Sequence, residues 1–159
     1  MIYEFQQKVE RVFLEAMVNG WANPEVKKVP LPGLPGSKAI RFRKEGLFVL
    51  DYYFSNPESG RSMGNTVILE GKTPVWMMSY GGHYPKEVVP FLKEALLVNY
   101  KAKVFVGARG PHFFENDTYA YVNTVMRGDF ESFFGEEKII HRESGRSLGH
   151  HTYFGKSLK

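Results

Sequence analysis

Asp51 is the residue whose surroundings most directly suggest chemistry. It lies in the segment Leu47–Phe54, where both alternating faces are otherwise apolar or aromatic. A carboxylate buried in such a strand needs a partner, because an unpaired buried charge is costly or is neutralised by a shift of its pKa. Arg109, Arg41 or a tyrosine hydroxyl could supply that partner. We therefore predict that Asp51 is buried and hydrogen-bonded beside the largest pocket, where it stabilises the fold, orients a ligand or transfers a proton.

Arg109 precedes Gly110 and Pro111, a context typical of a loop. Its guanidinium can bind a carboxylate of the fold or an anionic ligand through two parallel hydrogen bonds. Further titratable groups could converge with it in space. One interpretation is therefore a small enzyme with a pocket that uses Asp51, Arg109, Glu136, Glu137 and histidines.

The five histidines do not show the spacing of a metal site. His150 and His151 are adjacent in a predicted strand, so their side chains point to opposite faces. No H-x-x-x-H or H-x-H pattern is present. The sequence therefore predicts neither a metal site nor a cofactor.

Two G-x-S-x-G motifs, Gly60–Gly64 and Gly145–Gly149, match the nucleophile pattern of α/β-hydrolases. In that fold a helix follows the serine, whereas strand-like residues follow Ser62 and Ser147 here. The sequence favours hairpin turns with positive φ at the first glycine of each motif. It also predicts a bulge or a close approach of backbone at the last glycine.

Aromatic residues make up 15% of the chain, enough to fill a core and to line a pocket. Trp76, Met78 and Tyr80 share one face of a predicted central strand. Met and aromatic side chains together form adaptable apolar pockets. The residues predicted to bind a small ligand are Asp51, Tyr53, Trp76, Tyr80, Arg109, Tyr121 and Tyr153.

Two helices and eight strands are predicted to position these residues. Apolar residues at helical spacing predict one helix over 5–16 and another over 88–96. Alternating apolar residues predict strands at Lys38–Arg43, Leu47–Phe54, Met63–Leu69, Val75–Tyr80, Lys103–Val106, Thr118–Met126, Phe133–His141 and Leu148–Phe154. The short connections between many of them indicate antiparallel pairing.

These elements predict an α+β fold that is internally duplicated. Each half is expected to be a helix plus an antiparallel four-strand unit, with the two helices packed on a mainly antiparallel sheet. We expect a single domain over 1–159 with halves of about 1–84 and 85–159. The segment Glu58–Gly64 returns as Glu143–Gly149, but a longer register that pairs Gly64 with Gly135 and Tyr80 with Tyr153 is preferred.

Composition narrows the compartment and the partners. The net charge of +4 is too mild and too evenly spread to predict nucleic-acid binding. No apolar run reaches membrane-spanning length, and charged residues interrupt the N-terminal segment where a signal peptide would be apolar. There is no cysteine. A cytoplasmic protein without membrane association is expected.

The segments Asp51–Tyr53, Pro74–Gly82, Arg109–Pro111 and Phe134–Ile139 together resemble a bacterial family numbered 5680 in the domain-of-unknown-function series. Some members of that family follow a helix-turn-helix regulator module. The resemblance implies no catalytic residues. No helix-turn-helix precedes these segments in the sequence, so DNA binding is not expected.

The sequence as a whole favours a small-molecule-binding or regulatory module. A small enzyme is the first alternative. The second alternative is a protein-interaction module or homodimer, in which exposed strand edges and aromatic side chains form the interface.

Overall fold

A computed structural model describes residues 2–159 of the chain. Helix α1 (Ile2–Val18) comes first and helix α2 (Val89–Ala102) lies near the middle, after the short 3-10 helix η1 (Lys86–Val88). Five strands lie between α1 and η1: β1 (Val29–Leu31), β2 (Leu34–Lys44), β3 (Leu47–Ser55), β4 (Arg61–Glu70) and β5 (Thr73–His83). After α2 come β6 (Phe113–Glu115), β7 (Tyr119–Asp129), β8 (Ser132–His141) and β9 (Ser147–Ser157).

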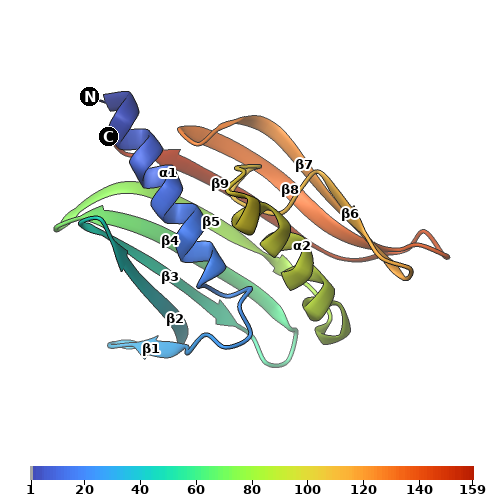
Figure 1. Ribbon diagram of the computed structural model, residues 1–159. Helices are drawn as coiled ribbons and strands as arrows, with labels where there is room; N and C mark the ends of the chain where they lie inside the picture. The colour runs from blue at the N-terminus through green and yellow to red at the C-terminus, as the bar shows by residue number, and fades with distance from the viewer. Residues whose placement is uncertain (1) are drawn as a thin grey trace.

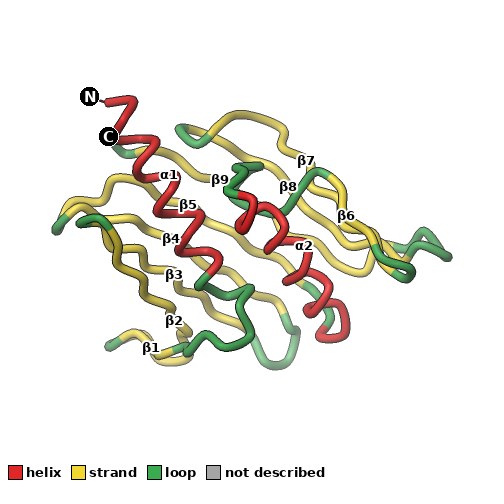
Figure 2. The backbone as a smooth tube through the Cα atoms, in the orientation of Figure 1, coloured by secondary structure: helices red, strands yellow, loops and turns green. Residues whose placement is uncertain are grey.

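The strands of residues 2–159 form one antiparallel sheet of nine strands, in the order β1-β2-β3-β4-β5-β9-β8-β7-β6. Hairpins connect β2 through β5 and β7 through β9, as Figures 1 and 2 show. The pairing of β5 with β9 joins these two series, and Tyr80 lies opposite Tyr153 at that junction. Side chains on the central strands β5 and β9 can therefore reach partners from both series.

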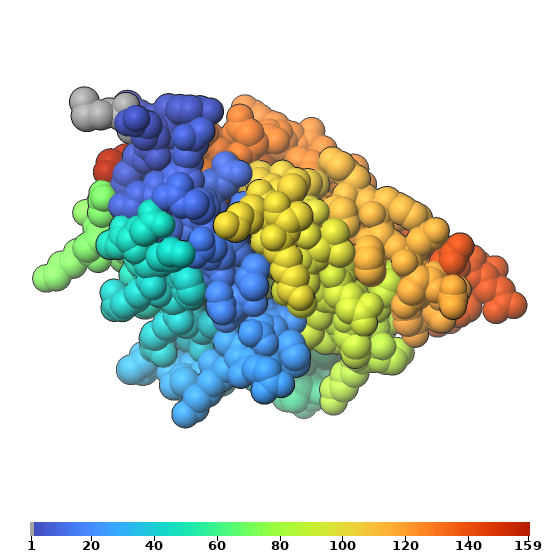
Figure 3. All heavy atoms as spheres, in the orientation of Figure 1, coloured from blue at the N-terminus to red at the C-terminus, as the bar shows by residue number. Residues whose placement is uncertain are grey.

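Both helices lie on the same face of the sheet (Figure 1). Helix α1 buries Val9, Val12, Phe13 and Ala16, which recur at the three- and four-residue spacing of one helix face. Against it, Trp76 stacks on Phe130 with ring centroids 5.0 Å apart. In the space-filling view, the helices and the segment after α1 lie over the sheet (Figure 3). The core therefore lies between one helical layer and one sheet layer.

The predicted α+β class and both predicted helices are confirmed, but the predicted duplication of a helix plus a four-strand unit is wrong. All strands in residues 2–159 belong to a single sheet, with five strands before α2 and four after it. The predicted strand Lys103–Val106 is also wrong. Lys103 has a φ of 57°, a left-handed conformation that ends α2, and the chain then forms a loop. The other predicted strands are confirmed, and the short edge strands β1 and β6 were not predicted.

Among the described residues, no helix combines the length and the apolar character needed to cross a membrane. The longest, α1, carries the charged residues Glu4, Lys8, Glu10, Arg11 and Glu15.

Candidate functional site

A cavity of about 190 Å³ lies between the helical layer and the sheet. Its helical side is largely apolar and includes Met17, Trp21, Leu92 and Leu96. Its sheet side includes Asp51, Thr66, Met78 and Tyr80. The lining residues that are exposed to solvent, Lys38, Ser55 and Gly60, mark its mouth. A second hollow of about 250 Å³, lined by Met63, Ser79 and Phe154 among others, is shallower and more open.

Asp51 lies on β3 at the sheet side of the enclosed cavity and is 6% exposed. Its Oδ1 accepts a hydrogen bond from the Tyr80 hydroxyl at 2.6 Å and another from the Thr66 hydroxyl at 3.1 Å. Thr66 lies directly opposite Asp51 on β4, and Tyr80 reaches it from β5. The prediction that Asp51 is buried and bonded beside a pocket is confirmed, although the pocket is the more enclosed of the two and not the larger.

Within residues 2–159, both hydrogen bonds that the Asp51 side chain accepts reach Oδ1 rather than Oδ2. Burial raises the pKa of the Asp51 carboxyl, and the hydrogen bonds from Tyr80 and Thr66 and the charge of Arg109 only partly offset that effect. Burial and the neighbouring Asp51 also raise the pKa of Tyr80, so its hydroxyl remains a neutral donor. Asp51 is thus held in place by one oxygen while the other remains available.

Gly64 explains how Tyr80 can reach Asp51. A Cβ atom on Gly64 would lie 2.7 Å from the Tyr80 hydroxyl and 2.6 Å from the Cβ of Tyr53, which are distances that real Cβ atoms do not adopt. Gly64 lies between these residues, opposite Tyr53 on β3 and opposite Tyr80 on β5. The predicted close approach at this glycine is confirmed, and it leaves room for the Tyr80 ring to cross β4.

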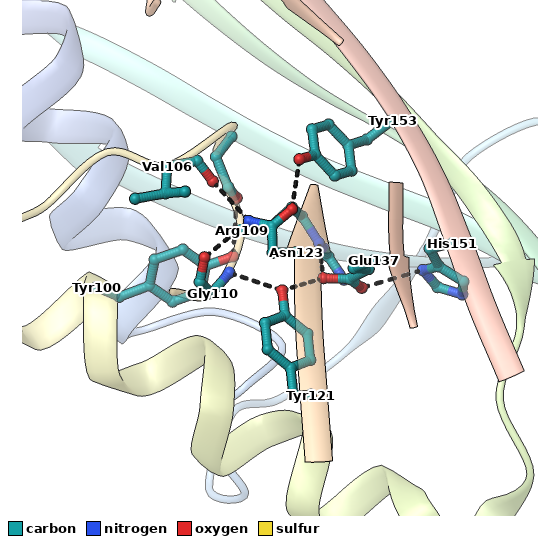
Figure 4. Close-up of polar contacts among 10 residues, drawn as sticks. Tyr100, Val106, Arg109, Gly110, Tyr121, Asn123, Glu137, His151 and Tyr153 are labelled. Atoms are coloured by element: carbon teal, nitrogen blue, oxygen red, sulfur yellow. Dashed lines mark hydrogen bonds and ion pairs between the residues drawn. The ribbon is translucent and has the colours of Figure 1, made fainter. Parts of the chain in front are cut away.

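Arg109 and Glu137 form a buried ion pair beside the cavity (Figure 4). Nη2 of Arg109 lies 2.5 Å from Oε1 of Glu137, and Nε donates to Oε2 at 3.1 Å. The Tyr121 hydroxyl also donates to Oε2. Burial alone would raise the pKa of Glu137, but the charge and hydrogen bonds of Arg109 hold it below its usual value. Glu137 is 0% exposed, and hydrogen bonds from Arg109 and Tyr121 reach both of its carboxylate oxygens. We call such a fully bonded acid saturated.

Side chains that donate to carbonyls of the loop after α2 hold Arg109 in position. The Tyr100 hydroxyl donates to the carbonyl of Ala108 at 3.0 Å, and Nδ2 of Asn123 donates to the carbonyl of Gly110 at 2.8 Å. Gly107 has a φ of 58°, and a Cβ there would lie 2.6 Å from the hydroxyl of Tyr153. A larger residue at 107 would displace the loop, so the glycine is required for Arg109 to meet Glu137.

His151 and Tyr84 line the cavity next to this ion pair. Their rings lie 4.8 Å apart between centroids, and Nδ1 of His151 lies 3.9 Å from Oε1 of Glu137. Within residues 2–159, neither Nδ1 of His151 nor the Tyr84 hydroxyl has a hydrogen-bond partner. Burial and the charge of Arg109 lower the pKa of His151 to about 4, so the ring is neutral near neutral pH.

Four of the seven predicted ligand-binding residues line this cavity: Asp51, Tyr53, Tyr80 and Arg109. The other three lie elsewhere. Trp76 packs in the core against Phe13 and Phe130, Tyr121 binds Glu137, and Tyr153 donates to Oδ1 of Asn123. The sequence placed Arg109 and Glu137 in one possible enzyme site, but it did not predict that they pair with each other.

The structure divides the residues of the predicted enzyme site. Asp51, Arg109, Glu137 and His151 lie at or beside the cavity. Glu136 and His150 point to the opposite face of the sheet and are exposed. The prediction that His150 and His151 face opposite ways is confirmed. Among residues 2–159, no group of three or more His, Asp or Glu side chains is arranged to hold a metal ion.

Several cavity residues were missed at the sequence level, chiefly Thr66, Tyr84, Leu92, Leu96 and Tyr100. Thr66 and Tyr84 carried a usable signal, since Thr66 is a polar residue on the alternating inward face of β4 and Tyr84 directly follows β5. Leu92 and Leu96 lie in the predicted helix over 88–96, but apolar spacing does not distinguish a core contact from a cavity wall.

Both G-x-S-x-G motifs form hairpin turns that run into strands. Gly60 and Gly145 have φ values of 69° and 67°, as predicted. Ser62 then lies in β4 and Ser147 begins β9, so neither serine occupies a strand-to-helix turn.

The fold and the site define an α+β protein with an enclosed, partly polar cavity between two helices and one face of a sheet. A family described as Domain of unknown function (DUF5680) matches residues 51–156, which is most of the chain, and the protein belongs to this family. Comparisons with curated proteins and with solved structures found no match.

Proposed function

We propose that this protein is a small-molecule-binding module whose ligand occupies the cavity beside Asp51. The observation that carries the proposal is that Asp51 lines the cavity and accepts both of its hydrogen bonds at Oδ1, which leaves Oδ2 for another donor. Buried polar groups in folded proteins are as a rule hydrogen-bonded, so an unused acceptor facing a cavity favours an exogenous donor. A ligand that donates to Oδ2 would add to the hydrogen bonds that Tyr80 and Thr66 donate to Oδ1.

The shape and composition of the cavity support the same function. Ligand sites are typically concave and apolar, with a few polar groups that fix orientation. Here Met17, Leu92 and Leu96 supply apolar contact, and Asp51 and Arg109 supply polar groups. Because Lys38 and Ser55 at the mouth are exposed, a small molecule has a route from solvent.

A regulatory role would operate through the helical layer. Helix α2 contributes Leu92, Leu96 and Tyr100 to the cavity, and the Tyr100 hydroxyl holds the loop that carries Arg109. A ligand that contacts α2 therefore also contacts the support of the Arg109 loop. Through this contact, a ligand in the cavity would alter the surface that α2 and the Arg109 loop present to a partner.

A fragment screen by saturation-transfer NMR tests the proposed function. We expect small ring compounds to bind the parent protein and to lose binding in Leu96→Trp, which fills the cavity. Val98→Trp, on the exposed side of the same helix, is the matched control and should bind like the parent. Native mass spectrometry of fresh protein would add the mass of any co-purified ligand. If every fragment bound Leu96→Trp and the parent equally, the cavity would not be the site and the proposal would fail.

A further inference from the structure

The polar groups around the cavity identify the chemical class of its ligand, an inference that rests on the proposed function. We infer that the cavity binds a protonated primary amine that is joined by a short alkyl chain to one aromatic ring, with the ammonium group against Oδ2 of Asp51. Three properties of the cavity support this class: its charge, its hydrogen-bonding groups and its size.

Charge is the first step: the exposed Lys38 lines the mouth of the cavity and the charges of Arg109 and Lys28 act on Asp51 from a distance, but Asp51 is the acid at the cavity that forms no ion pair within residues 2–159. Glu137 and Arg109 neutralise each other through two hydrogen bonds. The neutral ring of His151 adds no charge. Asp51 takes part in no ion pair with residues 2–159; its two bonded partners, Tyr80 and Thr66, are neutral hydroxyls. A ligand cation is the group that compensates this remaining carboxylate.

Hydrogen bonding is the second step. Tyr80 and Thr66 both donate to Oδ1, which leaves the lone pairs of Oδ2 for an incoming donor. An ammonium supplies up to three N–H donors together with a charge, and hydrogen bonds between two ionised groups are the strongest of this type. The ring of Tyr84 also lines the cavity, and aromatic faces attract cations, whereas Lys38 already lies over the Tyr53 ring and Arg109 over the Tyr80 ring.

Size is the third step. A cavity of about 150 Å³ with apolar walls accommodates a benzene ring. The cavity described above, at about 190 Å³, has room for one ring and a short chain. Met17, Leu92 and Leu96 offer the apolar walls that such a ring requires.

The guanidinium of Arg109 is the feature that most opposes a cationic ligand. It lines the same cavity, with its central carbon 5.7 Å from the centroid of the Tyr80 ring. Its charge is balanced at 2.5 Å by Glu137, whereas Asp51 has no comparable partner. The competing class, a ring bearing a carboxylate that binds Arg109 and Lys38, therefore forms one arm of the test.

Isothermal titration with three probes of matched shape tests the ligand class: 2-phenylethylamine, 2-phenylethanol and 3-phenylpropanoate. The amine should bind the parent at least about tenfold more tightly than the alcohol, because a charge-assisted hydrogen bond contributes more than a neutral one. The carboxylate should bind most weakly. Lowering the pH should weaken amine binding as Asp51 takes up a proton, since its pKa is raised, and should leave alcohol binding unchanged.

Two variants locate the effect. Asp51→Asn should reduce the affinity for the amine to that for the alcohol, and the exposed control Glu143→Gln should leave all three affinities unchanged. The comparison of probes and of pH in the parent needs no variant, so it remains decisive if Asp51→Asn folds poorly. An amine that binds no better than the alcohol, or less well than the carboxylate, overturns the ligand class. If alcohol binding is still lost in Leu96→Trp, the proposed function survives that result.

Discussion

Two buried carboxylates, Glu137 and Asp51, lie in the same sheet but have different hydrogen-bond partners, and their pKa values shift in opposite directions. Glu137 on β8 is bound by Arg109 through two hydrogen bonds and by Tyr121 through a third. Asp51 on β3 is bound by two neutral hydroxyls at one oxygen. As a result the pKa of Glu137 is lowered and that of Asp51 is raised, although burial acts on both in the same direction.

The register of the strands makes this comparison close. Asp51 lies opposite Thr66, and Asn123 lies opposite Glu137, so each cross-strand pair has one acidic and one neutral polar member. A tyrosine from the adjacent central strand donates to the residue on the outer strand in each case, Tyr80 to Asp51 and Tyr153 to Asn123. The difference is that the donors to Glu137 reach both of its carboxylate oxygens, whereas the donors to Asp51 reach only Oδ1.

Removal of the Glu137 charge should cause the largest loss of stability among the variants compared. Glu137→Gln leaves the buried Arg109 without its counter-charge, and breaking a buried pair in this way costs about 3 to 5 kcal/mol. Urea unfolding followed by circular dichroism measures the loss. Glu136→Gln, the exposed neighbour, is the control and should change the unfolding free energy by less than about 0.5 kcal/mol. Equal stability of the two variants would show that the ion pair does not hold the fold.

His151 should produce the next largest effect, as a dependence of stability on pH. The folded protein resists protonating His151 down to a pKa of about 4, whereas the unfolded chain takes up the proton near the usual pKa of about 6.5. The unfolded state therefore binds more protons in this window, and stability falls as pH falls from about 6.5 to 4, by on the order of 3 kcal/mol for this group.

The variant His151→Phe should remove that part of the pH dependence. Thermal unfolding between pH 4 and 7 measures it, with His150→Gln as the exposed control. Asp51 titrates with the opposite sign but is present in every protein compared, so its contribution cancels. A His151→Phe profile parallel to that of the parent would contradict the burial of a neutral imidazole.

Asp51→Asn should have a much smaller effect on stability, which sharpens the contrast with Glu137. Since the pKa of Asp51 is raised in the folded state, its ionised form costs stability at neutral pH, and that cost disappears as pH falls through the raised pKa. Asparagine keeps an oxygen for Tyr80 and Thr66 and removes the charge. We expect a change within about 1 kcal/mol at neutral pH, because a hydrogen bond to a neutral oxygen is retained. A loss as large as that of Glu137→Gln would assign Asp51 to the stability of the fold.

The serines of the two glycine-flanked motifs should have no effect on any esterase-like activity. Ser62 and Ser147 lie in strands, and neither one donates a hydrogen bond to a histidine within the described residues. Ser62→Ala and Ser147→Ala should match the parent. Labelling of either serine by a fluorophosphonate probe would contradict this expectation.

Local features of the fold were accessible from the sequence. The helical spacing in α1, the alternation in β3 and the turn glycines Gly60 and Gly145 each depend on residues close together in the chain. The burial of Asp51 also followed from its neighbours, because a lone acid in an apolar strand must be compensated. Lys103–Val106 misled the same reasoning, because the N–H groups of Lys103 and Val104 donate to the carbonyls of Tyr100 and Asn99 in the last turn of α2, so these residues cap the helix and do not form a strand.

The amino-acid sequence by itself determined both helices, the need for a partner at Asp51 and all strands except the short edge strands β1 and β6, because periodicity, turn chemistry and desolvation act over short stretches of chain. Only the tertiary structure decided that β5 pairs with β9 in one sheet, since backbone hydrogen bonds between strands are nearly independent of side-chain identity. The hydrogen bonds that Tyr100 and Asn123 make with the loop after α2 placed Arg109 on Glu137 rather than on Asp51. That choice between two carboxylates created both the saturated ion pair and the unsatisfied acid of the cavity.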